Sequence, residues 1–121
     1  TTSHQILVDV TKYGLGGDLE RKLEGANVVL NRNLLPWDIR EDRHYQNPGG
    51  IRIGVSEVTR LGMDEKDMAR VADFILRVVI EDEDPEKVRK DVEEFARDYQ
   101  EVHYCFDSTI DAYDYIDVLS P

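Results

Sequence analysis

The stretch NPGGIRIGVSEVTRLG, residues Asn47–Gly62, decides the fold of this chain. Its first four residues form a turn signal that leads directly into a short segment rich in β-branched residues, 51–55. Because side chains alternate between the two faces of a strand, every second residue of this segment is predicted to face a core. The core-facing residues are Ile51, Ile53 and Val55, and the residues on the opposite face are Arg52, Gly54 and Ser56. The rest of the stretch is predicted to be a polar turn before a long helix.

Arg52 is the residue of this stretch that carries recognisable binding chemistry. The strand holds its guanidinium on a rigid element, and Gly54, two residues on, leaves space beside it. A planar set of donors next to open space is what bidentate binding of a carboxylate or a phosphate requires. The alternative is that Arg52 is an ordinary surface arginine on the solvent side of a half-buried strand. The residues alone leave both interpretations open.

The composition predicts one soluble domain. The chain has 121 residues, 40% of them hydrophobic, which is enough for one core but not for two. No apolar run is long enough to span a membrane and no secretory signal pattern is present, so a cytoplasmic location is expected. The single cysteine, Cys105, excludes an internal disulfide and a thiolate zinc site. A charged fraction of 34% with few cysteines and methionines favours a thermophilic source. The absence of a methionine before Thr1 suggests a processed chain or a piece of a longer polypeptide.

The charge is distributed unevenly along the chain. The net charge is −11, and residues 81–121 carry 14 acidic and 4 basic residues. Such a segment repels phosphate backbones, so nucleic-acid binding is not expected. A solvated acidic face is the favoured interpretation, and a mimic of nucleic acid is the less favoured one. If the segment instead binds a basic partner, that binding should weaken strongly with salt.

Three elements are predicted before the central stretch. Residues His4–Val10 alternate as a strand, and the glycines of residues 14–17 end it. This GLGG loop lacks the lysine and hydroxyl of a phosphate-binding loop and does not fit GxGxxG spacing, so it is predicted to be a turn. A helix follows over Asp18–Glu24 with Gly25 as its C-cap, and Asn27–Asn31 is predicted to be the second strand. The inner side of the helix is formed by Leu19, Leu23 and Ala26.

Two helices are predicted after the central stretch. The first runs from Asp64, a suitable N-cap, to about Ile80. The second begins at Asp84 with Pro85 at its first helical position, and the short linker makes the two helices antiparallel neighbours. The expected core stripes are Met68, Val71, Ala72, Ile75 and Val79 in the first helix, and Val88, Val92, Phe95 and Tyr99 in the second. The predicted fold class is therefore α+β, with a small, mostly antiparallel β-sheet covered on one face by helices.

The loop after the second predicted strand contains two asparagines, Asn31 and Asn33, which share a face if the strand geometry continues. A carboxamide offers a donor and an acceptor together, which suits the edge of a heterocycle such as a pterin. The alternative is ordinary turn chemistry, in which asparagine is common. His103 and Cys105 lie two residues apart without a third ligand nearby, so no metal site is predicted. The chain has no triad order or nucleophile elbow, and no catalytic residue is assigned.

Three segments of the chain resemble, in the same order, motifs of one enzyme family. They are TTSHQILVDV (residues 1–10), NVVLNRNLLP (residues 27–36) and GGIRIGVSEVTRLG (residues 49–62). Together they resemble the C-terminal domain of serine hydroxymethyltransferase, a pyridoxal-phosphate enzyme of fold type I. The resemblance extends from Thr2 to about Ile80, and the opening segment and the LLPW loop look like archaeal members. It implies the small α+β domain that ends such enzymes.

The resemblance implies binding roles for two residues. Arg52 would bind the α-carboxylate of serine or glycine, and Asn33 would contact the pterin of the co-substrate. The chain departs from the family pattern at three positions: Arg32 replaces the usual lysine, Gly49 the usual serine, and Val55 the usual threonine. The co-substrate therefore stays open between tetrahydrofolate and a carrier of the tetrahydromethanopterin type.

The resemblance also implies partners and a cofactor outside this chain. The full enzyme interconverts serine and glycine with one-carbon transfer to a tetrahydropterin, and pyridoxal 5'-phosphate supplies the electron sink. The lysine that holds this cofactor belongs to a larger domain, so the expected partner is the missing PLP-binding domain, within a homodimer. The chain alone is predicted to be inactive. Residues 1–105 would form the small domain and residues 106–121 an acidic, aromatic tail.

Two hypotheses of other classes remain. A stand-alone amino-acid-binding module would show measurable affinity for glycine or serine. An acidic interaction protein would use residues 81–121 to bind a basic partner.

Overall fold

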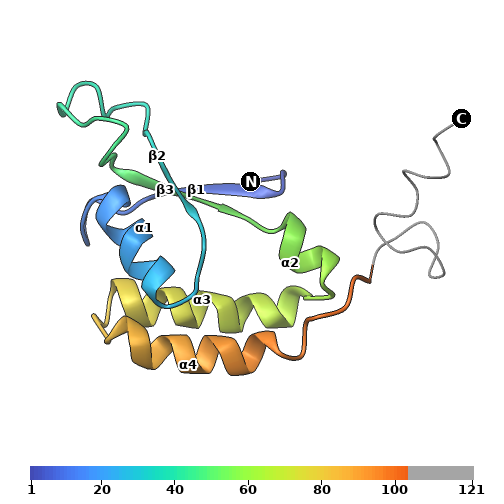
Figure 1. The fold of residues 1–121 in the computed structure, drawn as a ribbon. Coiled ribbons are helices and arrows are strands. Elements are labelled where there is room, and N and C mark those ends of the chain that lie inside the picture. The colour runs from blue at the N-terminus through green and yellow to red at the C-terminus, as the bar shows by residue number, and fades with distance from the viewer. Residues whose placement is uncertain (104–121) are drawn as a thin grey trace, which may run out of the picture.

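The computed structural model describes residues 1–103, so Cys105 and the predicted tail 106–121 lie outside the described residues (Figure 1). The elements are β1 Gln5–Asp9, α1 Gly16–Gly25, β2 Asn31–Asn33, β3 Gly50–Gly54, α2 Ser56–Arg60, α3 Glu65–Val79 and α4 Pro85–Ala96. Helix α1 lies between the sheet and a layer formed by α3 and α4, which run side by side in opposite directions. The fold is α+β with a small antiparallel sheet, as predicted.

Strand β3 is the centre of the sheet. The strand order is β1-β3-β2, and both pairings are antiparallel. Arg52 lies opposite Leu7 of β1 and Asn31 of β2, so these three side chains share one face. Ile51, on the other face, is 2% exposed, and Ile53 packs against the same core. The predicted alternation is therefore confirmed for residues 51–54, whereas Val55 and Ser56 lie beyond the end of β3, and Ser56 begins α2.

The predicted strand Asn27–Asn31 is wrong, because the end of α1 uses the backbone donors that a strand would need. The amide of Asn27 donates to the Glu24 carbonyl (2.9 Å), and that of Val28 donates to the Leu23 carbonyl (2.9 Å). Asn27 adopts a left-handed φ of 61°, which completes a Schellman-type helix end. The second strand is instead Asn31–Asn33, which shares only Asn31 with the predicted strand and extends into the segment expected to be a loop.

Helix boundaries differ from the prediction in two places. Helix α1 begins at Gly16 rather than Asp18, and it includes Gly25, so the C-cap is Ala26. The segment expected to be a polar turn after β3 contains the short helix α2. The starts of α3 and α4 are as predicted, with Asp64 as the N-cap of α3 in a capping box. Asp84 is the N-cap of α4, and Pro85 occupies the first turn.

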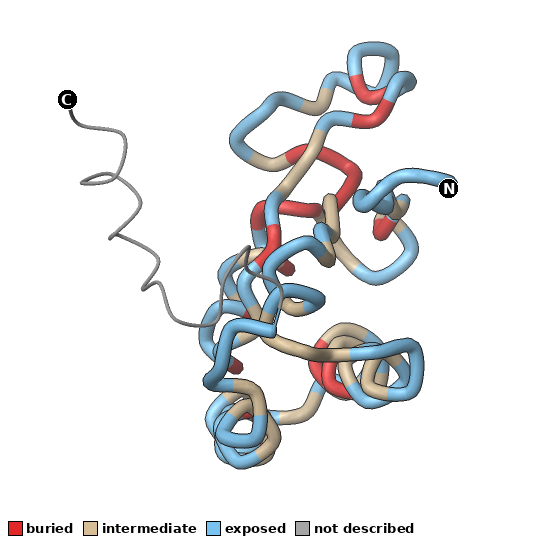
Figure 2. The backbone as a smooth tube through the Cα atoms, turned by 90° about the vertical axis from the view of Figure 1, so that its right-hand side faces the viewer, coloured by how far each residue is buried: buried red, intermediate tan, exposed pale blue. Residues whose placement is uncertain are grey.

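The core lies where α1 meets the sheet, α3 and α4, and Figure 2 shows the buried segments. Its members are Val10, Leu19, Leu23, Ala26, Leu30, Ile51, Phe74, Val78, Val88 and Val92. The predicted inner side of α1 and the predicted stripe of α4 are confirmed, although Tyr99 lies beyond the end of α4. The α3 stripe is wrong in part: Phe74 and Val78 are buried, whereas Met68, Val71 and Ala72 line an open groove. The cause is that α1 covers only the C-terminal part of α3 (Figure 1).

Tyr99 joins the end of the α4 segment to the start of α3. Its hydroxyl donates to Asp67 Oδ1 over 2.5 Å, while Asp67 Oδ2 accepts from the Asp64 amide. This hydrogen bond to a carboxylate raises the pKa of Tyr99 to about 12 and lowers the pKa of Asp67.

No helix among residues 1–103 combines the length and the hydropathy needed to cross a membrane.

We expect Tyr99 to ionise at about pH 12, and Asp67→Asn to return its pKa towards the ordinary value near 10. The stability that this hydrogen bond contributes is fully present below pH about 10 and is lost as the pH rises through about 12. The difference in absorbance between wild type and Tyr99→Phe, followed against pH, measures this ionisation. Asp98→Asn is the control and should shift the midpoint much less. Equal midpoints in wild type and Asp67→Asn would contradict the assignment.

Candidate functional site

A polar cavity of about 270 Å³ lies beside β2 and β3. It is lined by Glu20, Asn31, Arg32, Asn33, Tyr45 and Arg52, and we call it the Arg52 pocket. The sheet register explains why its members meet: Asn31 lies opposite Arg52, and Asn33 lies opposite Gly50, one alternation further along the same face. The structure therefore brings both predicted site residues, Arg52 and Asn33, to one cavity.

The Arg52 guanidinium is available to an anion. Arg52 is half-buried, and no carboxylate of residues 1–103 lies within ion-pairing distance of it. A Cβ at Gly54 would meet nothing within 4 Å, so the predicted open space beyond Arg52 is present. A guanidinium held on the central strand with open space beside it can accept a carboxylate through two parallel hydrogen bonds.

Arg32 sits in the same pocket but is already engaged. Its Nη1 donates to Glu20 Oε2 over 2.8 Å, and its Nε donates to the Tyr45 carbonyl over 3.0 Å. The guanidinium carbon lies 5.0 Å from the centroid of the Tyr45 ring. Arg32 therefore fixes α1 and the loop before β3 against β2, and it contributes positive charge to the pocket wall.

The loop between β2 and β3 is held by a buried carboxylate, Asp38, which is 0% exposed. Asp38 Oδ2 accepts hydrogen bonds from the amides of Leu35 (2.7 Å) and Gly49 (2.9 Å). Its Oδ1 accepts from Arg43 Nη1 (3.2 Å). Burial raises the pKa of the Asp38 carboxyl, but these three donors outweigh burial and hold the pKa below its ordinary value. Asp38 is therefore ionised at neutral pH.

The glycines at the start of β3 are required by close packing. A Cβ at Gly49 would lie 2.6 Å from Asp38 Oδ1, and one at Gly50 would lie 2.7 Å from Leu35 Cδ2. The backbone of the GLGG loop crosses this turn, where Gly16 donates to the Pro48 carbonyl over 2.6 Å. The turn predicted over residues 14–17 is therefore wrong in its second half, because Gly16 and Gly17 belong to α1. The lack of a Cβ at Gly16 lets α1 start directly against the entry to β3.

Sequence reasoning missed three residues that build this site. Glu20 lies on a different element from the predicted residues, and no local pattern connects it with Arg32. Tyr45 and Asp38 lie in the loop between β2 and β3, and the sequence indicated no role for either residue. The only available signal was an aspartate two residues after a proline, and burial of that aspartate is visible only in the folded chain.

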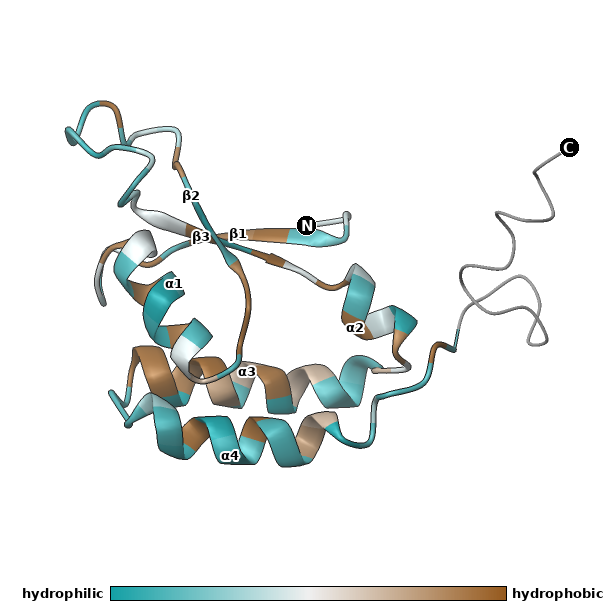
Figure 3. Ribbon diagram, in the orientation of Figure 1, coloured by the Kyte–Doolittle hydropathy of each residue, from teal (hydrophilic) through white to brown (hydrophobic). Residues whose placement is uncertain are grey.

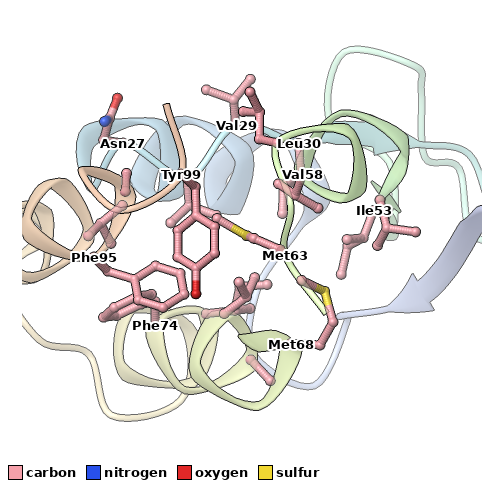
Figure 4. A pocket seen from close by; sticks show the side chains of 18 of the residues that line it. Asn27, Val29, Leu30, Ile53, Val58, Met63, Met68, Phe74, Phe95 and Tyr99 are labelled. Atoms are coloured by element: carbon pink, nitrogen blue, oxygen red, sulfur yellow. The ribbon is translucent and has the colours of Figure 1, made fainter. Parts of the chain in front are cut away.

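A second cavity, of about 430 Å³, opens between the sheet and helices α2, α3 and α4. We call it the apolar groove, and Figure 4 shows its lining from close by. The labelled lining residues are Asn27, Val29, Leu30, Ile53, Val58, Met63, Met68, Phe74, Phe95 and Tyr99. Figure 3 shows that the segment linking α1 to β2 is also hydrophobic. The groove offers little polar chemistry, so it is suited to apolar polypeptide rather than to a charged substrate.

Residues 1–103 thus form a small α+β domain with a polar cavity lined by two arginines and two carboxamides, and with an apolar groove that no other part of these residues covers. The family model for serine hydroxymethyltransferase matches residues 1–75. The serine hydroxymethyltransferase of Nitrosopumilus maritimus is 51% identical over 116 residues, covering 96% of this chain. That of Methanocella arvoryzae is 55% identical over 107 residues, covering 88% of this chain. This chain therefore belongs to the serine hydroxymethyltransferase family, as the three motifs indicated.

The match covers only part of the relatives. The chain spans 26% of the length of the Nitrosopumilus maritimus protein and 25% of that of Methanocaldococcus jannaschii, which is 47% identical over 111 residues. The relatives named here are archaeal, in agreement with the expected archaeal character. The chain thus matches about a quarter of the length of these relatives.

We expect Gly50→Ala to destabilise the domain by roughly 1–3 kcal/mol, because the new methyl group would press on Leu35 and on the Asn33 carbonyl. Gly54→Ala on the same strand is the matched control and should change stability by less than about 0.5 kcal/mol. Urea unfolding followed by circular dichroism measures both. Equal losses in the two variants would contradict the close packing at the start of β3.

Proposed function

We propose that this chain is the C-terminal small domain of a serine hydroxymethyltransferase, which interconverts serine and glycine with one-carbon transfer to a tetrahydropterin. The observation that carries the proposal is the Arg52 pocket, where a guanidinium without an ion-pair partner among residues 1–103 shares one face of the sheet with a carboxamide, in a member of this family. In this proposal residues 1–105 form the domain, and residues 106–121 form an acidic tail.

Arg52 binds the α-carboxylate of serine or glycine in this proposal. The central strand fixes the origin of its side chain, and the open space beyond Gly54 leaves room for the approaching anion. A carboxylate matches the guanidinium in geometry and charge, so the pair forms two charge-assisted hydrogen bonds. This contact orients the amino acid but moves no proton, so Arg52 is a binding residue.

Asn33 contacts the pterin in this proposal. Its Nδ2 donates to the Leu34 carbonyl over 2.9 Å, which fixes the plane of the carboxamide. The Oδ1 atom can then accept a hydrogen bond from a ring N–H or an amino group of the pterin. Tetrahydrofolate and tetrahydromethanopterin both present such donors, so both are candidates for the co-substrate.

The residues around Arg52 do not fit pyridoxal phosphate. The pocket lining contains no lysine amine that could bind the aldehyde of the cofactor. We therefore assign the cofactor to the part of the enzyme that the longer relatives carry and this chain lacks, and we expect the chain alone to be inactive. We also expect the whole enzyme to be a homodimer in the cytoplasm of a thermophilic archaeon.

We propose that the PLP-binding part of the enzyme binds in the apolar groove. Helix α1 lies between the sheet and one end of α3 (Figure 1). The apolar groove is lined by the N-terminal half of α3 together with residues of the sheet, α2 and α4. Val29 at its edge is 80% exposed, and Ile6 is 44% exposed. Leaving such a surface in water is unfavourable, and the relatives are about four times as long as this chain. Polypeptide from the PLP-binding part is the occupant that this arrangement favours.

The role of Arg52 can be tested by combining the chain with a matching PLP-binding domain and measuring conversion of serine to glycine with each tetrahydropterin. We expect Arg52→Ala to lower kcat/KM for serine at least roughly 30-fold, because the substrate carboxylate loses a charged partner. Arg52→Lys should recover only part of the loss, since lysine keeps the charge without the paired donors. Arg40→Ala, at an exposed arginine outside the pocket, should behave like wild type.

Unchanged activity in Arg52→Ala would overturn the proposed carboxylate contact. Activity of the isolated chain would contradict its assignment as an inactive domain. Binding of glycine to the isolated chain, without activity in the mixture, would favour the stand-alone amino-acid-binding module instead.

Binding of the PLP-binding domain in the apolar groove can be tested by substitutions in α2. We expect Val58→Asp to weaken association between the chain and a separately produced PLP-binding domain at least about tenfold, because a carboxylate would be buried among apolar groups. Thr59→Asp, at the exposed neighbouring position, is the matched control. Analytical ultracentrifugation of the mixture measures the association. Equal affinities for the two variants would show that the partner binds elsewhere.

A further inference from the structure

We propose that Asp38 is the positioning residue of the Arg52 pocket, because it ties the exit of β2 to the entry of β3. The inference deepens the proposed function and rests on it. Asp38 does not line the pocket and is completely buried, so it does not touch a ligand there. It acts through the residues that do.

A single carboxylate oxygen joins the two strand ends. Leu35 lies two residues after Asn33, and Gly49 lies directly before β3, yet both amides donate to Asp38 Oδ2. Asn33 and Gly50 are cross-strand partners at this end of the sheet, and Arg52 is one alternation further along β3. By holding the two strand ends together, Asp38 therefore fixes the spacing between the carboxamide of Asn33 and the guanidinium of Arg52.

The surroundings restrict Asp38 to one orientation. A methyl group at Gly49 would lie 2.6 Å from Asp38 Oδ1, so the turn backbone packs directly on the carboxylate. On the other side Arg43 donates both its side-chain Nη1 to Asp38 Oδ1 and its backbone amide to the Asp38 carbonyl, the latter over 2.9 Å. Hydrogen bonds to a buried charge are shorter and stronger than neutral ones, so the tie is rigid.

Arg43 explains why the residue is an acid rather than an amide. An asparagine at position 38 could still accept from Leu35 and Gly49 through its single oxygen. Its NH₂ group would then face the Arg43 guanidinium, placing donors against donors. The wild-type carboxylate satisfies all three donors at once, and its charge compensates that of Arg43 within a buried site.

The test uses the chain combined with a PLP-binding domain and measures kcat/KM for serine, together with thermal stability. We expect Asp38→Ala to lower kcat/KM roughly tenfold to a hundredfold, because the binding groups lose their alignment. The effect should be at most about twofold in an Arg52→Lys background, since lysine lacks the paired donors whose direction Asp38 fixes. Asp42→Asn, at an exposed acid of the same loop that does not contact Arg43, is the matched control and should leave kcat/KM unchanged.

A rescue variant keeps the proposal testable if Asp38→Ala folds poorly. Asp38→Asn alone should lower kcat/KM, and Asp38→Asn with Arg43→Gln should restore most of it, because the glutamine oxygen accepts from the asparagine NH₂. A loss of equal size in the wild-type and Arg52→Lys backgrounds, or a fall in stability with unchanged kcat/KM, would overturn the positioning role. If Arg52→Lys and Arg52→Ala themselves keep wild-type kcat/KM, the proposed function fails instead.

Discussion

The pairing of β3 with both of its neighbours is the constraint on which the rest of the structure depends. Ladders on both edges fix the register of this five-residue strand, and the register decides which side chains share a face. A slip of one residue would turn Arg52 into the core and expose Ile51. The two glycines before Ile51 let the loop and α1 approach the strand closely enough to hold that register.

The charged residues near β3 separate into compensated and uncompensated groups. Asp38 with Arg43 and Glu20 with Arg32 are ion pairs that hold the loop and α1 in place. Among the described residues Arg52 has no such partner, although it lies on the most constrained strand. A half-buried charge without a counter-ion costs solvation free energy, and that cost is offset when an anion binds. The arrangement is typical of a ligand site rather than of a structural salt bridge.

The apolar groove leaves one side of the domain with an exposed hydrophobic surface. Helix α1 buries the apolar residues at the C-terminal end of α3. The apolar residues of α2 and of the first half of α3 line the groove instead. The apolar stripe predicted for α3 is thus present, but no element among residues 1–103 covers its N-terminal half. The relatives reported above are about four times as long as this chain, which supplies a physical reason for that surface.

The sequence by itself determined the central strand, the starts of α3 and α4, the α+β class and the family, because these depend on local alternation, capping and ordered motifs. It also selected Arg52 and Asn33 as candidates. Only the tertiary structure decided that they line one cavity with Glu20 and Tyr45, that Asp38 is buried, and that α1 leaves part of α3 uncovered. These features depend on contacts between residues far apart in the chain, and local patterns carry no information about such distances. The misplaced second strand has the same origin, since the end of α1 claimed the backbone donors of Asn27 and Val28.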